Sequence, residues 1–341
     1  MNKKKSKQIL RIFLLVGTVV SMFFVPWLLV KAWVLPLPDS LQAQADEAID
    51  HGFDGIVVYI DKGGETPKTY TSGWHDREKK IPAKPTALFK IASIGKLYNA
   101  VAIAKLVKSD RLSLDKTVAD YFPEFADRIE YADKITLKHL VQHKSGIPNY
   151  SNHPGYWGNP TKTDQETMEL ILDLPANFKP GEDYEYCNTN YLLNRLLIEK
   201  ELGYSIFQFI TEEILTPLNL SNTFENLWAV NMDEVMSGYH VGYGEDLKSG
   251  EWGMLATAQD VASFVRALND GSVFKEGEQE IYASIYEYKH SGWVPGYQSF
   301  AEYHKDIDAV VVEFYNTTDD KLFMWNAAEI VNSRILKIIS K

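Results

Sequence analysis

The sequence predicts an α+β fold, in which an antiparallel sheet is flanked by N- and C-terminal helices and a large helical region is inserted between the two halves of the sheet. Strand-like patterns lie near both ends of the chain, and helix-like patterns fill the middle. We expect one domain at 40–341, with its sheet part at about 40–90 and 275–341 and its helical part at about 91–274. One transmembrane helix is expected to precede this domain, within 1–36.

The first segment has the composition of a membrane anchor. A basic cluster at 3–11 precedes an uncharged run at 12–30, which is about long enough to cross a hydrocarbon core as one helix. Basic residues favour the cytoplasm, so we predict a single-pass protein with a cytoplasmic stub and with everything after Trp33 on the periplasmic or extracellular side. Ala-Gln-Ala at 43–45 is typical of signal-peptide cleavage, but it lies far beyond the apolar run. Cleaved or retained, the segment predicts export.

The strands and helices follow from hydrophobic periodicity and turn residues. Alternating patterns near both ends predict two pairs of strands, and apolar stripes at helical spacing predict helices between them. A helix is predicted at 40–51, before the first strand, and a closing helix from about Leu322. The strands are expected at 55–61, 68–74, 296–304 and 309–315, and the inserted helices at 93–108, 136–143, 165–174, 191–201, 206–215 and 257–269.

Composition excludes several classes of function. The net charge of −11 includes six cations and no acidic residue among residues 1–31, so the exported part is strongly acidic and repels polyanions such as nucleic acids. The single cysteine, Cys187, excludes a disulfide within the chain. His139 and His143 are four residues apart, but no third ligand accompanies them. We therefore expect no metal site and no nucleic-acid partner, and structural roles for both histidines.

The segment at 89–96, Phe-Lys-Ile-Ala-Ser-Ile-Gly-Lys, places a serine near the start of a predicted helix and a lysine one turn later. Residues three apart share one face of a helix, so the Lys96 amine can reach the Ser93 hydroxyl. The helix N-terminus also favours negative charge that develops there. The alternative is a capping serine followed by a solvated lysine. Because Ser113 and Lys116 have the same spacing, the surrounding motifs must decide.

A serine–lysine hydrolase also needs a second group that carries the proton. Two Tyr-x-Asn triplets could supply it, one beginning at Tyr150 and the other at Tyr186. The second triplet follows a Pro-Gly turn at 180–181 and opens a predicted helix, which would hold its tyrosine rigidly. Position therefore favours Tyr186.

Such a site further needs a wall that holds the substrate against oxyanion donors. Candidate segments lie at 240–242, 248–250 and 290–292. Only the last, His-Ser-Gly, leads directly into the C-terminal strand pair, where a strand edge can bind an extended substrate and Gly292 lets it approach closely. The adjacent Lys289 is expected on the opposite face of that strand.

Taken in order, these segments resemble the serine β-lactamase and penicillin-binding-protein superfamily, and specifically its class C β-lactamase-like branch. The resemblance runs from about Gly55 to the C-terminus. It implies a β-lactamase/transpeptidase-like fold and acyl transfer without a cofactor. Ser93 would attack a carbonyl, Lys96 and Tyr186 would carry its proton, and either of the two could be the base. Further motifs in family order are Arg-Leu-Ser-Leu-Asp at 111–115, the run at 136–146, Pro-Gly at 180–181 and Pro-Leu at 217–218.

The same resemblance assigns the substrate-binding residues. Asn188 would hold a substrate amide, and the backbone N–H groups of Ser93 and Trp293 would form the oxyanion hole. His290 and Gly292 stand where class C β-lactamases typically carry the first and last residues of Lys-Thr-Gly. This His-x-Gly form resembles D,D-carboxypeptidases, D-aminopeptidases and esterases of the branch. A neutral histidine holds a carboxylate less firmly than a lysine does, so efficient β-lactamase activity is not expected.

We therefore expect an exported, membrane-anchored serine hydrolase of the carboxypeptidase or esterase type. Its substrate would be an ester or amide of a small or peptide-like molecule, with the cell-wall peptide as the natural class. The alternative is a non-catalytic module that binds wall peptides with the same fold. Cys187 is expected to be a small packing residue, whereas Tyr150, Tyr156 and Trp157 either shape the substrate pocket or form the core of a loop.

Overall fold

The computed structural model describes residues 3–161 and 163–341. A six-stranded sheet in the described part has the order β3-β2-β1-β10-β9-β8, and each neighbouring pair is antiparallel. The predicted α+β class with an antiparallel sheet is confirmed. The strands are β1 (Gly55–Lys62), β2 (Lys68–Asp76), β3 (Ile81–Pro82), β8 (His290–Val294), β9 (Tyr297–His304) and β10 (Ala309–Tyr315).

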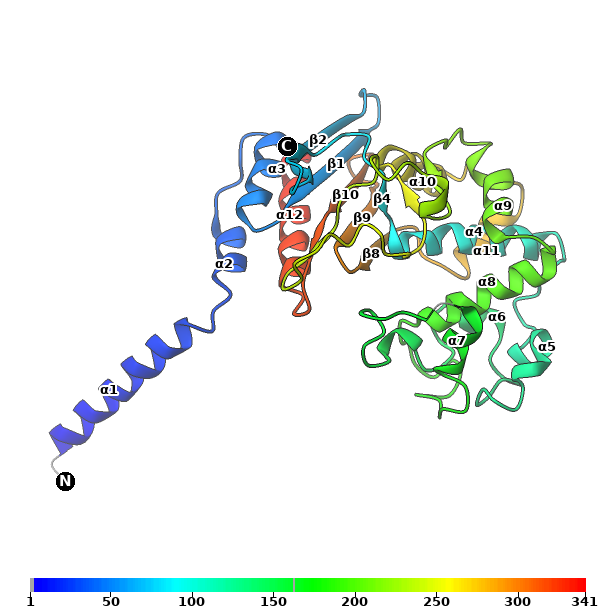
Figure 1. Cartoon of the computed structure of the whole chain (residues 1–341), viewed down its shortest axis with the longest axis horizontal. Coiled ribbons are helices and arrows are strands. Elements are labelled where there is room, and N and C mark those ends of the chain that lie inside the picture. The colour runs from blue at the N-terminus through cyan, green and yellow to red at the C-terminus, as the bar shows by residue number, and fades with distance from the viewer. Residues whose placement is uncertain (1–2, 162) are drawn as a thin grey trace.

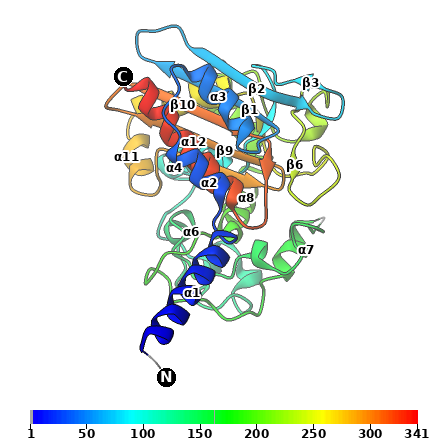
Figure 2. The same cartoon turned by 90° about the vertical axis from the view of Figure 1, so that its left-hand side faces the viewer.

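The centre of the sheet joins the two ends of the chain, because β1 pairs with β10 from Ile56 opposite Tyr315 to Lys62 opposite Ala309. Successive side chains of a strand point to opposite faces. Thus Ile56 and its even-numbered neighbours in β1 pack against α3 (Leu41–Asp50) and α12 (Phe323–Ile339), whereas Val57 joins the larger core on the other face. Figure 2 shows α3 and α12 together over one face of the sheet, as predicted.

The other face of the sheet is covered by α10 (Ala258–Asp270), which packs against β1, β9 and β10. Thr257 caps this helix by accepting a hydrogen bond from the Asp260 N–H, and Gly271 ends it in the left-handed conformation. The predicted helical part thus contributes a helix to the sheet layer. The domain boundaries within 40–341 stay a prediction.

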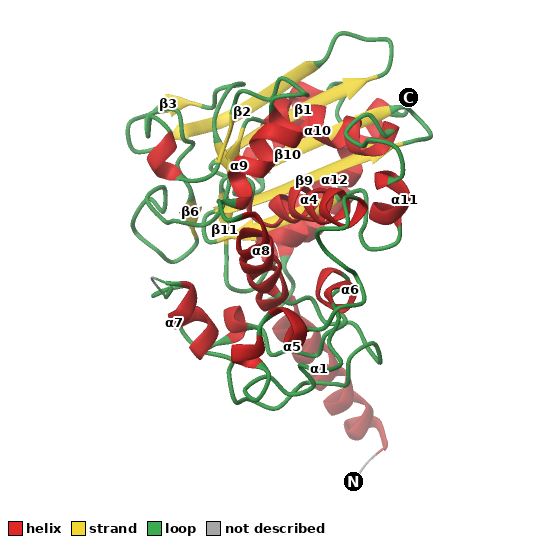
Figure 3. Cartoon of the chain, turned by 90° about the vertical axis from the view of Figure 1, so that its right-hand side faces the viewer, coloured by secondary structure: helices red, strands yellow, loops and turns green. Residues whose placement is uncertain are grey.

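One of the remaining helices, α4 (Gly95–Lys108), is largely buried. The others are α5 (Val118–Tyr121), η2 (Pro123–Phe125), α6 (Leu137–Val141), η3 (Tyr150–Asn152), α7 (Asp164–Glu169), α8 (Asn188–Leu202), α9 (Ile206–Ile210), the π-helix η4 (Thr211–Leu215), η5 (Leu227–Ala229) and α11 (Glu278–Ala283). Figure 3 shows α5 to α8 below the sheet and α9 in front of it, and Figure 1 shows α4 among them. The short strands are β4 (Phe89–Lys90), β5 (Thr223–Phe224), β6 (Tyr239–His240), β7 (Leu255–Ala256) and β11 (Thr317–Thr318).

The expected transmembrane helix is interrupted. Two helices, α1 (Lys3–Met22) and α2 (Trp27–Val34), replace it, and Pro26 lies at their junction because it cannot continue a helix. No single helix in the described residues is long and apolar enough to cross a membrane. The pair Arg11–Met22 and Trp27–Val34 meets that test together, bent by 81°.

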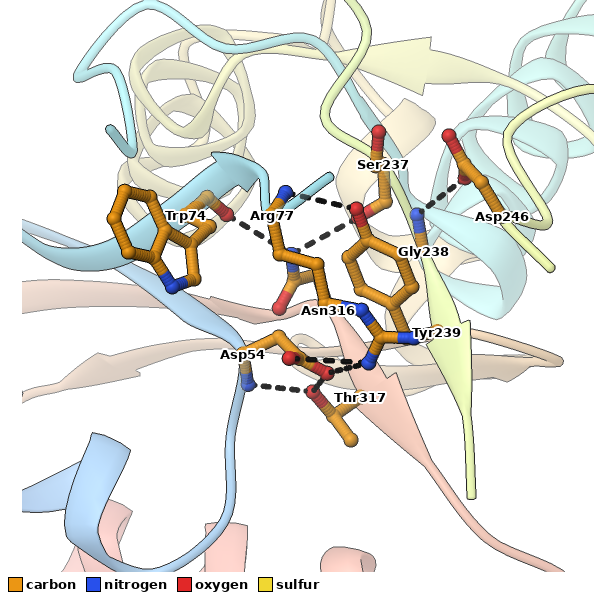
Figure 4. A network of polar contacts seen from close by, with 9 residues as sticks. All are labelled: Asp54, Trp74, Arg77, Ser237, Gly238, Tyr239, Asp246, Asn316 and Thr317. Atoms are coloured by element: carbon orange, nitrogen blue, oxygen red, sulfur yellow. Dashed lines mark hydrogen bonds and ion pairs between the residues drawn. The ribbon is translucent and has the colours of Figure 1, made fainter. Parts of the chain in front are cut away.

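A partly buried network of polar contacts ties the sheet to the segment that runs from Ser237 towards the nucleophile (Figure 4). Two hydrogen bonds of 3.1 and 3.2 Å join Arg77 to the Asp54 carboxylate. The Asn316 amide donates to the carbonyl oxygens of Trp74 at 3.1 Å and Ser237 at 2.9 Å. Because Asn316 is fully buried, these bonds hold the start of the following segment, 237–254, firmly against the sheet. We call 237–254 the bracing segment.

Candidate active site

Ser93 lies on a strained turn between a strand and a helix. It belongs to the 3-10 helix η1 (Ala92–Ile94), between β4 and the start of α4, so the helix predicted from residue 93 begins as a tighter turn. Ala92 has φ +49°, a left-handed conformation that costs energy for any residue with a β-carbon. Such strain persists only where the surroundings hold the turn in place.

The bracing segment contacts β4, the strand directly before the Ser93 turn. Lys90, in β4, is buried, and its Nζ donates to the carbonyl oxygen of Leu247 at 2.9 Å and lies 4.8 Å from the centre of the Trp252 ring. Burial lowers the pKa of Lys90 to about 7. The network in Figure 4 fixes one end of the bracing segment, and Lys90 holds the segment at Leu247.

Glycine is required where β8 passes the turn. A methyl group at Gly292 would lie 2.5 Å from the carbonyl oxygen of Ile91, 2.6 Å from Ser299 Oγ and 3.1 Å from Ala92 Cβ. The N–H of Ile91 in turn donates to the carbonyl oxygen of Met254 at 3.0 Å. The edge strand of the sheet therefore approaches the nucleophile turn as closely as the backbone allows.

Four of the predicted site residues form one hydrogen-bonded cluster. Lys96 Nζ donates to Ser93 Oγ at 3.0 Å and to Asn188 Oδ1 at 2.9 Å, and the Tyr186 hydroxyl donates to Ser93 Oγ at 2.6 Å. Tyr186 precedes α8, and Asn188 is its first residue. The serine thus has an amine on one side and a phenol on the other, both within proton-transfer distance.

Asn188 is oriented by the loop that contains the other Tyr-x-Asn triplet. Its side-chain N–H donates to Ser151 Oγ at 3.0 Å, and its backbone N–H donates to Asn149 Oδ1 at 3.1 Å. Ser151 also donates to Asn149 Oδ1 at 3.0 Å. The segment at 150–152 therefore supports the site through its serine, a role that the sequence did not indicate, and Tyr186 is the tyrosine that contacts Ser93.

His290 lies at the start of β8 with both ring nitrogens engaged. Nδ1 lies 2.5 Å from the carbonyl oxygen of Ser291, which can only accept, so Nε2 accepts from the Tyr286 hydroxyl at 2.9 Å. The side chain is 6% exposed. Burial, reinforced by the charge of Lys96, lowers the pKa of His290 to about 4, and the ring is neutral at pH 7. Sequence reasoning missed Tyr286, which no motif marks.

Trp293 brings the aromatic loop to the site. Its ring packs edge-on against Trp157 with 5.6 Å between ring centres, and Trp157 in turn packs on Tyr156, which packs on Tyr150. The loop thus has a packed row of aromatic rings that reaches β8, and its predicted alternative role of shaping the substrate pocket stays a prediction. A cavity of about 340 Å³ opens nearby and is lined by Tyr184, Tyr186, Glu287, Lys289, His290, Ser291, Phe300, Ala301 and Glu302.

Other polar residues make packing and hydrogen-bond contacts around the site. His143 lies under the Tyr186 ring with 4.5 Å between ring centres, and its Nδ1 accepts from the backbone N–H of Cys187 at 3.0 Å. Burial and the charge of Lys96 lower the pKa of His143 to about 3. His139 caps α6. Cys187 is buried, and burial raises the pKa of its thiol.

Comparison with known proteins gives partial sequence matches. The chain is 32% identical over 195 residues to Protein flp of Staphylococcus aureus (strain MW2), which covers 55% of this chain and 39% of that protein. It is 28% identical over 177 residues to penicillin-binding protein 4* of Bacillus subtilis (strain 168), which covers 51% of this chain and 38% of that protein. The chain therefore matches less than half the length of either relative.

Likeness to solved structures is more extensive. The chain superimposes on D-amino acid amidase from Ochrobactrum anthropi SV3 with a TM-score of 0.77 and 22% identity, covering 88% of this chain and 97% of that one. This likeness shows a shared fold. The family model named Beta-lactamase matches residues 39–284, most of the chain, including Ser93, Lys96 and Tyr186. The chain belongs to the Beta-lactamase family, within the superfamily of serine β-lactamases and penicillin-binding proteins.

Proposed function

We propose that this protein is a serine hydrolase that cleaves an ester or amide bond through an acyl-enzyme, as a D,D-peptidase-like or esterase-like enzyme. The observation that carries this proposal is the environment of Ser93 Oγ, which lies 3.0 Å from Lys96 Nζ and 2.6 Å from the Tyr186 hydroxyl. A serine is a weak nucleophile unless a neighbouring base takes its proton. Here both Lys96 and Tyr186 are close enough to Ser93 Oγ to accept its proton.

The proposed reaction has two halves. Ser93 Oγ attacks the substrate carbonyl while Lys96 or Tyr186 accepts its proton, and the same pair returns the proton to the leaving group. Backbone N–H groups of Ser93 and Trp293 stabilise the oxyanion. Ser93 suits this role because the first N–H groups of a helix lack partners within it. Water then attacks the ester and releases the acyl group, and Asn188 holds the substrate amide.

The charges near His290 favour a substrate whose nearby end is uncharged. His290 is neutral, with both nitrogens engaged, and the cavity beside it carries the carboxylates of Glu287 and Glu302 against one ammonium, Lys289. Lys289 is paired with Glu302 at 2.7 Å. A free substrate carboxylate would find little attraction there. The structural likeness to a D-amino acid amidase, solved in complex with L-phenylalanine amide, supports amides as one class to test.

We further propose that the protein is exported and attached to a membrane by its N-terminal helices, with the basic end in the cytoplasm. The basic cluster at 3–11 and the apolar run at 12–30 support this placement. Wall peptides remain the proposed natural substrate class, supported by the match to a penicillin-binding protein, and the charges beside His290 favour those whose bound end is uncharged. A module that only binds such peptides would have no need of both Lys96 and Tyr186 at one hydroxyl, so catalysis is favoured.

Hydrolysis of p-nitrophenyl acetate by the full chain in detergent tests the catalytic proposal. We expect a burst of nitrophenol, an acetylated Ser93 peptide in mass spectra, and at least about 10³-fold less turnover in Ser93→Ala. Ser113→Ala is the matched control, because Ser113 and Lys116 have the same spacing. Absent turnover in folded protein, or equal turnover in Ser93→Ala, would refute catalysis at Ser93. Phenylalanine amide and D-alanyl-D-alanine peptides then separate uncharged from carboxylate ends.

A further inference from the structure

The turn between α1 and α2 is closed by hydrogen bonds. The indole N–H of Trp27 donates to the carbonyl oxygen of Met22, the last residue of α1, at 2.9 Å. The backbone N–H of Trp27 donates to the carbonyl oxygen of Val25 at 2.8 Å. Helix ends normally leave carbonyl groups without partners, and here a side chain of the next helix satisfies one. These bonds favour a defined angle, which is 81°. We call this junction the elbow (residues 23–27).

The far end of α2 is fixed to the folded domain by one arginine. Arg334 of α12 is 4% exposed. Its Nη1 donates to the carbonyl oxygen of Leu35 at 2.6 Å, and its Nη2 donates to that of Pro36 at 2.8 Å. The same guanidinium binds both carboxylate oxygens of Glu47 at 3.1 Å, and Gln44 Oε1 accepts from its Nε at 2.8 Å. The connector after α2 is thereby bound to α3 and α12.

Between these two ends, α2 packs along α12, and Ala32 is fully buried. The exposed side of α2 and the elbow is mostly apolar, with Lys31 as an exposed charged residue of α2. Phe24 is 82% exposed and Trp33 76%, and Phe23, Trp27 and Val34 are exposed as well. Contiguous exposed aromatic residues mark an interaction surface. Figures 1 and 2 show α2 against the domain and α1 extending away from it.

We propose that the elbow and α2 lie in the headgroup region of a lipid bilayer, with α1 entering the bilayer and Arg334 transmitting the fixed orientation of α2 to the hydrolase domain. This inference rests on the proposed membrane attachment. A lipid partner is favoured because the exposed aromatic residues continue directly from the uncharged part of α1. Tryptophan is enriched at membrane interfaces, and a helix nearly perpendicular to an inserted one lies in the membrane plane.

A measurement of depth tests the geometry. In the full chain carrying Cys187→Ala, spin labels are placed singly at Val30→Cys and Val34→Cys, which lie four residues apart on one face of α2. The protein is reconstituted into vesicles of phosphatidylethanolamine and phosphatidylglycerol. If α2 lies in the membrane plane, the two labels have the same depth within about 3 Å, near the headgroups. A straight helix that continued through these residues would separate them by about 6 Å along the bilayer normal, since each residue adds 1.5 Å.

Unequal depths of that size, or two labels in water on vesicle-bound protein, would overturn the proposal. A label at Trp228→Cys is the matched control, because Trp228 is 83% exposed but belongs to η5 rather than the elbow, and we expect it in water. A lipid-embedded control label would mean non-specific insertion and would also overturn the proposal. Failure of the full chain to float with vesicles would instead refute membrane attachment itself. Ester hydrolysis at Ser93 is measured separately and fails independently.

Discussion

Two lysines lie three residues on either side of Ser93, and their surroundings differ completely. Lys90 precedes the serine in a strand, is buried, and donates to a backbone carbonyl beside aromatic rings. Lys96 follows the serine in α4 and donates to Ser93 and Asn188. A strand sends a residue at this spacing to the opposite face, whereas a helix brings it to the same face. Residue spacing therefore predicts chemistry only together with the backbone conformation between the residues.

The largest effect is expected at Lys96. Lys96→Ala removes the amine that contacts Ser93 Oγ, so kcat/KM for an activated ester should fall by at least about 10³-fold. Thermal unfolding should change little, because Lys96 is only partly buried. Parallel measurement of kcat/KM and Tm checks both. A variant that stays within tenfold of wild type would remove Lys96 from the proton path.

The variant Tyr186→Phe tests whether the phenol takes part in proton transfer together with Lys96. The ring would keep its packing on His143 while the hydroxyl at 2.6 Å from Ser93 Oγ is lost. We expect kcat to fall by about 10²- to 10³-fold with KM nearly unchanged. Steady-state kinetics on one ester decide this. A rise in KM at constant kcat would show that Tyr186 only binds substrate.

Lys90→Met should change stability more than chemistry. Burial lowers the pKa of Lys90 to about 7 in the folded protein from its usual 10.5, so the unfolded chain binds a proton that the folded protein lacks between those values. This group therefore makes wild type more stable as pH rises from 7 towards 10.5.

Guanidinium unfolding of wild type and Lys90→Met at pH 7 and 9 measures that contribution. The free energy of unfolding of wild type relative to the variant should rise by about 2 kcal/mol over this range. Lys305→Met, at an exposed lysine, serves as the control and should show no such slope. A pH-independent difference for Lys90→Met would mean that the buried amine stays charged.

The smallest effect is expected at His290. Because the pKa of His290 is lowered to about 4, its ring gains a proton only in acid. The pH–rate profile should therefore show no change near pH 6.5 that is caused by this residue. His290→Asn should leave the pH–rate profile between pH 5 and 8 unchanged in shape and kcat/KM within about tenfold. An acid limb near pH 6.5 that disappears in the variant would show that His290 titrates in the working range.

The fold and the position of the site were accessible from sequence where a pattern repeats. Alternating apolar residues predicted the strands that became β1, β2, β9 and β10, and the Ser-x-x-Lys and Tyr-x-Asn motifs predicted residues that the structure brings together. The pattern of apolar residues could not show the interruption at Pro26, because a straight helix and a bent pair of helices can have the same uncharged sequence. Hydrophobicity alone does not predict the angle between two helices.

Other features depend on contacts between distant segments. Tyr286 receives its role from His290, and Ser151 receives its role from the amide of Asn188; neither lies in a motif that marks it. The strained φ of Ala92 depends on the segments packed around it. Such features follow from tertiary packing and could not be predicted from one chain.

The pairing of β1 with β10 also sets the order in which the molecule can assemble. Ile56 meets Tyr315 in the centre of the sheet, so nearly the whole chain must be available before the sheet closes. Contacts of such high sequence separation slow folding and leave strand edges open meanwhile. The strand that carries His290 and Gly292 docks on β9, which itself needs β10. An unfinished chain therefore has a serine but no wall to hold a substrate, and stays inert until its last strands arrive.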